Sequence, residues 1–155
     1  MRLFLLVLPA SVLLASGAMA QAQLDPVEFT GSDEALEFRF GASAGGVPLP
    51  LKPEALYAKA EGPVIVFVLE GVTTQRQWPR WSDKGIKKTL VRLHSRNKGW
   101  SVLRVRTHAP VPKAVIEGIR VRVEGGRLIA AVPRSLSIAK AWAAPEDLAV
   151  AAPEP

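Results

Sequence analysis

The chain has 155 residues, of which 48% are apolar and 22% charged, so it is too hydrophobic to be disordered throughout and can form one domain core. It contains no cysteine, which excludes disulfides, thiol nucleophiles and thiolate metal sites. Its 20 Lys and Arg residues outnumber its 14 Asp and Glu residues, which favours an anionic or neutral partner.

The first 20 residues have the composition of an export signal. Arg2 supplies a positive charge, an apolar run follows, and the small residues Ala18 and Ala20 suit a signal peptidase pocket. We therefore expect cleavage after Ala20 and a periplasmic mature protein. An uncleaved membrane anchor is the alternative, against which Pro9 and the small-residue end argue. No later stretch has the length and apolar character to span a bilayer, so no transmembrane segment is expected after cleavage.

The rest of the chain divides by composition into three parts. Residues 21–34 form an acidic lead-in, and residues 35–134 carry the strand-like patterns of a single domain. Residues 135–155 contain a short helix-forming stretch and end in Ala/Pro-rich sequence, which we expect to be a flexible tail.

The domain begins with a clear strand pattern. In residues 36–40, Leu36, Phe38 and Phe40 alternate with charged residues, which predicts a strand with one apolar face. Residues 41–50 are rich in Gly, Ser and Pro and predict a loop.

Further strand signals follow. Residues 53–60 suit either a helix or a strand, because a helix-starting proline precedes good helix formers that lead into a buried run. That run, residues 64–69, is continuously β-branched and aromatic, as in a strand buried on both faces. Residues 89–93 and 102–107 are shorter strand candidates in which basic and apolar residues alternate.

A hairpin closes the domain. Two alternating segments flank Gly125 and Gly126, and a two-residue Gly-Gly turn places Val121 opposite Ala130 and Glu124 opposite Arg127, which we expect to form an ion pair. Five to seven short strands with turn signals indicate an all-β sandwich or a small barrel.

Catalytic motifs are scarce. His94 and His108 have no metal-ligand partner at a suitable spacing, and the only acids in residues 72–134 are Asp83, Glu117 and Glu124. The chain has no G-x-S-x-G elbow and no phosphate-binding glycine loop. We therefore expect no enzymatic activity, no cofactor and no metal.

Positive charge is concentrated in one stretch. Residues 21–71 contain eight acidic and three basic residues, whereas residues 72–134 contain fifteen basic and three acidic ones. If the arginines of residues 102–107 and of the hairpin point away from the core, they form one basic sheet face that neighbouring residues extend. The candidate ligand-binding residues are Lys88, Arg92, Trp100, Arg104, Arg106, Arg120 and Arg122.

Trp78, Trp81 and Trp100 lie in the same basic region and could offer platforms for sugar rings. The alternative is that the basic residues only solvate an outward face and the tryptophans close the core edge. Nucleic acid suits the charge, but we expect none as a partner, because the protein is exported from the cytoplasm. Peptidoglycan, whose stem peptides carry free carboxylates, is the anionic polymer that a periplasm offers.

The order of these segments resembles the AMIN domain, a small periplasmic β-domain of cell-wall amidases and type IV pilus secretins. The resemblance covers residues 36–132 and rests on segments 36–40, 62–72, 85–93, 101–106, 109–112 and 124–129. The chain departs from the family at Val68 and Glu70, where Asp and often Pro are usual, and at Ser101 or Val102, which replaces an arginine common in the later strand.

The resemblance implies a sandwich of two antiparallel sheets over residues 35–134. It also implies a non-catalytic targeting module that binds peptidoglycan and localises an envelope complex. Two alternatives remain: a protein-interaction subunit of a secretion, pilus or flagellar export apparatus, which would use exposed strand edges, and a hydrolase with a distributed site.

Overall fold

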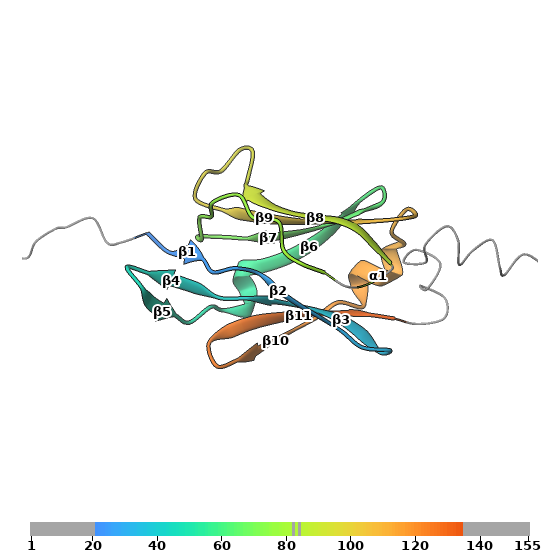
Figure 1. Cartoon of the computed structure of the whole chain (residues 1–155), viewed down its shortest axis with the longest axis horizontal. Coiled ribbons are helices and arrows are strands. Elements are labelled where there is room, and N and C mark those ends of the chain that lie inside the picture. Colours follow the sequence, from blue (N-terminus) through green and yellow to red (C-terminus); the bar gives the residue numbers. More distant parts are fainter. Residues whose placement is uncertain (1–20, 82, 84, 135–155) are drawn as a thin grey trace, which may run out of the picture.

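The protein is an all-β sandwich, seen here in a computed structural model that describes residues 21–81, 83 and 85–134 (Figure 1). The signal peptide and the tail predicted from the sequence lie outside these residues. The strands are β1 (Gln23–Leu24), β2 (Glu28–Gly31), β3 (Ala35–Phe40), β4 (Ala42–Ala44), β5 (Val47–Leu49), β6 (Leu56–Glu61), β7 (Val64–Leu69), β8 (Ile86–Leu93), β9 (Ser101–Thr107), β10 (Arg120–Glu124) and β11 (Arg127–Pro133). A 3-10 turn, η1 (Pro53–Ala55), precedes β6, and the short helix α1 (Lys113–Glu117) links β9 to β10.

Two four-stranded antiparallel sheets face each other (Figure 1). The β3 sheet has the order β10-β11-β3-β2, and the β7 sheet has the order β6-β7-β9-β8. A three-stranded sheet, β1-β4-β5, lies at one end of the sandwich. The predicted sandwich is thus confirmed, with a small third sheet in addition. No helix in the described part of the chain is long and apolar enough to cross a membrane.

The core lies between the two large sheets. Phe38 and Phe40 point inward from β3 and meet Phe67 of β7, with ring centroids 5.4 and 5.9 Å apart. The alternation of residues 36–40 therefore predicted the inward face of β3 correctly, since Leu36, Phe38 and Phe40 are all buried.

Strand β7 is buried on both faces, as its sequence predicted. Its odd-numbered residues, 65, 67 and 69, belong to the main core, whereas Val64, Val66 and Val68 lie on the outer side of the sheet. There they form a second apolar cluster with Val102, against which the half-buried Trp100 packs.

The closing hairpin has the predicted register. Val121 lies opposite Ala130 and Glu124 opposite Arg127, and Gly125 and Gly126 form the turn with φ values of 56° and 78°. The predicted Glu124–Arg127 ion pair is wrong. Glu124 instead accepts a 2.9 Å hydrogen bond from Arg122, which lies on the same face of the same strand. Arg127 reaches across β3 to the carboxylate of Glu28.

The loop prediction for residues 41–50 is also wrong. Gly45 and Gly46, with φ values of 57° and 80°, form a two-residue turn between β4 and β5. Each strand has only three residues, Ala-Ser-Ala in β4 and Val-Pro-Leu in β5, which is too short to show the apolar alternation that marks β3. Residues 53–60, for which the sequence allowed either a helix or a strand, form the turn η1 and then most of the strand β6.

Candidate functional site

Four of the predicted basic residues share the outer face of the β7 sheet. Lys88 lies opposite Arg106, and Arg104 lies between Val66 and Leu90 in neighbouring strands. Arg92 lies opposite Val102, one step further along the same face. We call this surface the basic face, and it consists of Lys59, Lys88, Arg92, Arg104 and Arg106 with the acidic residue Glu61.

The expectation of a single arginine row that includes Arg120 and Arg122 is wrong. Both residues lie on β10, at the edge of the β3 sheet, on the opposite side of the sandwich from β9. Arg122 also forms ion pairs with Glu37 at 2.8 Å and with Glu124. The hydrogen bond from Arg122 lowers the pKa of the Glu37 carboxyl below its ordinary value. These arginines are therefore separated from the basic face.

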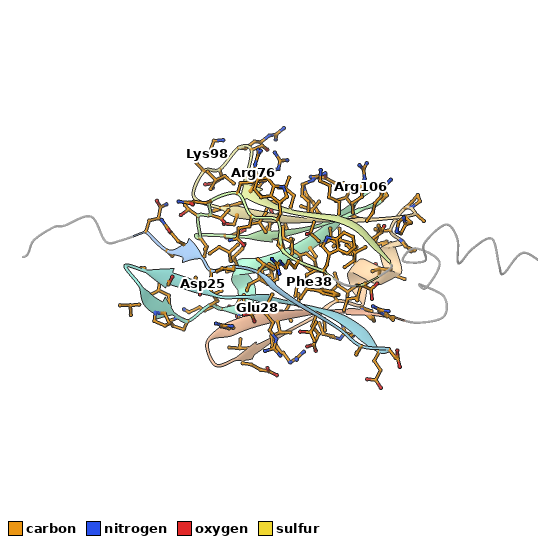
Figure 2. All side chains as sticks on the ribbon, viewed as in Figure 1. Asp25, Glu28, Phe38, Arg76, Lys98 and Arg106 are labelled. Carbon is orange, nitrogen blue, oxygen red and sulfur yellow. The ribbon has the colours of Figure 1, made fainter. Side chains whose placement is uncertain are left out.

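The two outer faces differ in charge. The basic face carries five basic side chains and one acidic side chain, Glu61. The outer face of the β3 sheet is nearly balanced, with the basic residues Arg39, Arg120, Arg122 and Arg127 against the acidic residues Glu28, Glu37 and Glu124. Figure 2 shows Arg106 projecting from the β7-sheet side, together with Arg76 and Lys98 from adjoining loops. Only one side of the sandwich is strongly positive.

Arg104 lies flat across β7. Its Nη1 is 3.0 Å from a carboxylate oxygen of Glu61, and the Nζ of Lys59 is 3.2 Å from the other oxygen. The hydrogen bond from Lys59, and to a smaller extent the one from Arg104, lowers the pKa of the Glu61 carboxyl below its ordinary value. The ion pair therefore spans the outer face of β7, from Arg104 on β9 to Glu61 on β6.

Three cations of the basic face are free of acidic partners within the described residues. Lys88, Arg92 and Arg106 form no ion pair there, in contrast to Lys59 and Arg104. Their charges are therefore available to an anionic ligand, whereas Glu61 offsets one of the two positive charges of Lys59 and Arg104.

The tryptophans have different environments. Trp100 packs on the outer valine cluster and touches His94 edge-on, with ring centroids 5.5 Å apart, so it closes the end of the sheet. Trp78 and Trp81 do not fill the core, since 65% and 38% of their surfaces are exposed.

His94 organises the loop between β8 and β9. Its Nδ1 accepts hydrogen bonds from the backbone N–H groups of Arg96 and Asn97, at 3.2 and 3.1 Å. Since Nδ1 is an acceptor here, the neutral ring carries its proton on Nε2. The histidine has a structural role in this loop.

Replacement of His94 tests that role. Asn places its amide oxygen near the position of Nδ1, whereas Gln places it one bond further out. We expect His94→Gln to lower the free energy of unfolding by about 1 kcal/mol through loss of two partly exposed hydrogen bonds, and His94→Asn to retain most of that stability. Urea denaturation of both variants measures the difference. Equal stabilities would show that the acceptor position is unimportant.

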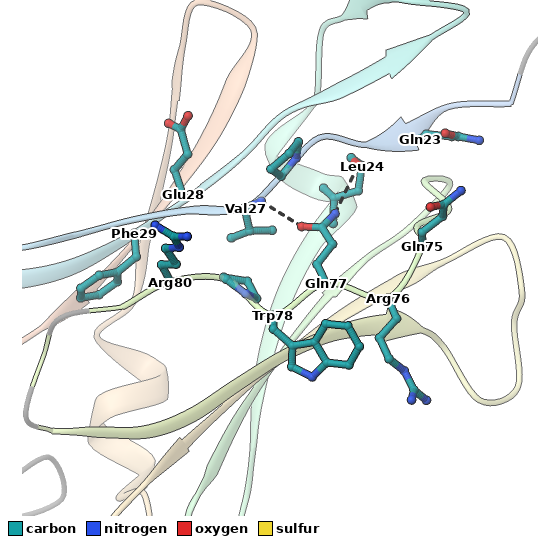
Figure 3. Close-up of a pocket in the computed structure, with 12 residues that line it drawn as sticks. Gln23, Leu24, Val27, Glu28, Phe29, Gln75, Arg76, Gln77, Trp78 and Arg80 are labelled. Atoms are coloured by element: carbon teal, nitrogen blue, oxygen red, sulfur yellow. Dashed lines mark hydrogen bonds between the residues drawn. The ribbon is translucent and has the colours of Figure 1, made fainter.

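A groove of about 710 Å³ lies between the segment 23–29 and the loop 75–80 (Figure 3). Gln77 points toward the first segment, accepts a 3.1 Å hydrogen bond from the Val27 N–H and donates to the carbonyls of Leu24 and Asp25. Trp78 and Arg76 point away from that segment. The role of Gln77 could not be predicted from the sequence, because Leu24, Asp25 and Val27 lie about 50 residues away from it.

The chain matches no protein-family model and no curated protein. Within the described residues, no three acidic or histidine side chains gather as metal ligands. The most distinctive surface of the domain is the basic face.

Proposed function

We propose that the domain is a non-catalytic, AMIN-like module of the bacterial periplasm that binds peptidoglycan and localises an envelope complex. One observation carries the proposal: five basic side chains lie on one outer sheet face with a single acid, while the opposite face is nearly neutral. The ligand is then an anionic polymer, and the carboxylates of peptidoglycan stem peptides supply the negative charge.

The unpaired cations of the basic face would make the contacts. Arg92 and Arg106 offer guanidinium groups that match a carboxylate with two parallel hydrogen bonds, and Lys88 adds a point charge next to Arg106. Each exposed pair contributes only about 0.2–1 kcal/mol. Useful affinity therefore comes from many stem peptides on one polymer, since a second contact on the same strand is effectively intramolecular.

Sedimentation with purified cell-wall sacculi tests this face. The variant Lys88→Gln/Arg106→Gln removes two unpaired charges from the basic face. The control Arg120→Gln/Arg127→Gln removes two positive charges from the other sheet. At low salt we expect the first variant to bind about five- to tenfold more weakly than the wild type, which corresponds to about 1 kcal/mol. We expect the control to remain within about twofold.

Salt gives a second readout of the same binding. The fraction of wild-type protein bound to sacculi should fall as ionic strength rises, because exposed charge pairs are screened beyond about 10 Å at 0.1 M. Equal losses for the two double variants would show that only net charge matters and would remove the basic face as the site.

A second candidate function is a protein-interaction subunit of an envelope machine. The exposed Trp78 beside the groove favours it, because tryptophan is enriched at the centres of protein interfaces. The two candidates separate in one experiment. Absence of wall binding in the wild type, with crosslinking from position 78 to one envelope protein, would favour the interaction subunit.

A further inference from the structure

A second hollow lies at one end of the β7 sheet, where β8 meets two loops. It has a volume of about 390 Å³ and is lined by Thr74, Arg76, Arg92, Leu93, Ser95 and Lys98. We call it the cationic hollow. A water molecule occupies about 30 Å³ in the liquid, so the hollow has room for a small polyatomic anion and several waters. Arg76 and Lys98, which project at the same end of the sheet in Figure 2, were not among the site residues predicted from the sequence.

The backbone that carries these cations is held in place. Gln77 forms two backbone hydrogen bonds with Val91 of β8, at 2.9 and 3.0 Å, and this antiparallel bridge places the backbone of Arg76 across from that of Arg92. Lys98 lies in the loop that His94 and Asn97 hold through side-chain hydrogen bonds to backbone N–H groups. Three segments therefore present a positive charge to one hollow from separate, anchored positions.

No acid neutralises the three charges. Within the described residues, neither Arg76, Arg92 nor Lys98 forms an ion pair, and no acidic side chain lines the hollow. Three like charges around one hollow repel each other, and a bound anion relieves that repulsion. Ser95 adds a hydroxyl that can donate a hydrogen bond.

We propose that the cationic hollow binds a phosphate monoester group. A phosphate monoester carries a charge near −2 at neutral pH and has three strong acceptor oxygens, whereas a carboxylate carries −1 and has two. Because Coulomb attraction scales with the charge of the ligand, three cations favour the dianion. The three cations also come from three segments, so acceptor oxygens that point in several directions suit them better than the two oxygens of a planar carboxylate. This site is separate from the peptidoglycan contacts proposed above, apart from Arg92, which borders both.

Titration followed by amide NMR shifts tests the site. Inorganic phosphate, glycerol 3-phosphate and acetate are added to the protein at low ionic strength and pH 7.5. We expect saturable shifts for the two phosphates in residues 74–77 and 92–98, with a dissociation constant on the order of a millimolar, and at least about tenfold weaker binding of acetate. Vesicles that contain phosphatidic acid distinguish a lipid source from a soluble one: tighter binding to the vesicles than to glycerol 3-phosphate identifies the lipid.

Matched variants decide whether the hollow or the overall charge is responsible. Arg76→Gln/Lys98→Gln removes two charges that line the hollow, and Lys87→Gln/Arg96→Gln removes two exposed charges that do not. We expect about tenfold weaker phosphate binding for the first variant and less than about twofold for the second. Equal weakening in both variants, or acetate binding as tight as phosphate, would overturn the proposal.

Discussion

Replacement of Phe67 by alanine is expected to lower the free energy of unfolding by about 4 kcal/mol. Phe67 is 1% exposed and lies between the two large sheets. Its ring contacts Phe38 and Phe40 of the opposite sheet. Loss of the ring therefore removes the aromatic contacts between the sheets and leaves a cavity that rigid strands on both sides cannot close.

Tyr57 provides the control for this change. It belongs to the same sheet, in the strand paired with β7, but it lies on the outer face and is 41% exposed. We expect Tyr57→Ala to cost less than about 1 kcal/mol, since little buried surface is lost. Urea denaturation of both variants gives the two values. Similar losses would contradict the placement of the core between the sheets.

The second large effect is expected at Gln77. Its Oε1 accepts a hydrogen bond from the Val27 N–H, while its Nε2 donates to the carbonyls of Leu24 and Asp25 and to the Thr74 hydroxyl, at 3.2–3.4 Å. The variant Gln77→Glu keeps the shape and the acceptor but replaces the donors by a carboxylate that faces two carbonyl oxygens. We expect a loss of about 2 kcal/mol in the free energy of unfolding.

Gln75 offers a matched control two residues away. It is exposed, so Gln75→Glu introduces the same charge without breaking the anchor of the segment 24–27. We expect the control to change stability by less than about 0.5 kcal/mol. Hydrogen exchange adds a local readout: although Glu retains an acceptor for the Val27 N–H, its carboxylate repels the carbonyls of Leu24 and Asp25 and should detach the segment, so the Val27 amide should exchange faster in Gln77→Glu only. Equal protection of that amide in both variants would show that Gln77 does not hold the segment.

Strands were predicted well from the sequence where a segment has a clear pattern of apolar residues or a clear turn signal. The alternation of residues 36–40, the apolar run 64–69 and the Gly-Gly hairpin each agree with the structure in orientation or register. These features are local, because a strand that buries one face must alternate and a two-residue glycine turn fixes the pairing of its neighbours.

The candidate site was predicted only in part, and the reason is the long-range order of the strands. Alternation shows that Arg104 and Arg120 face outward from their own sheets, but it does not show which sheet each strand joins. The pairing of β9 with β7 and of β11 with β3 places these arginines on opposite sides of the sandwich. Gln77 and the cationic hollow were missed for the same reason, since both depend on contacts between segments far apart in sequence.

The basic face is tested most directly by mapping where a soluble peptidoglycan fragment binds. Amide NMR shifts are recorded as muropeptides that carry free stem-peptide carboxylates are added to the protein. We expect the largest shifts on β8 and β9, at Lys88, Arg92, Arg104 and Arg106, and little change on β3 and β11. Shifts concentrated on the β3 sheet, or no saturable shift at all, would contradict the proposed function.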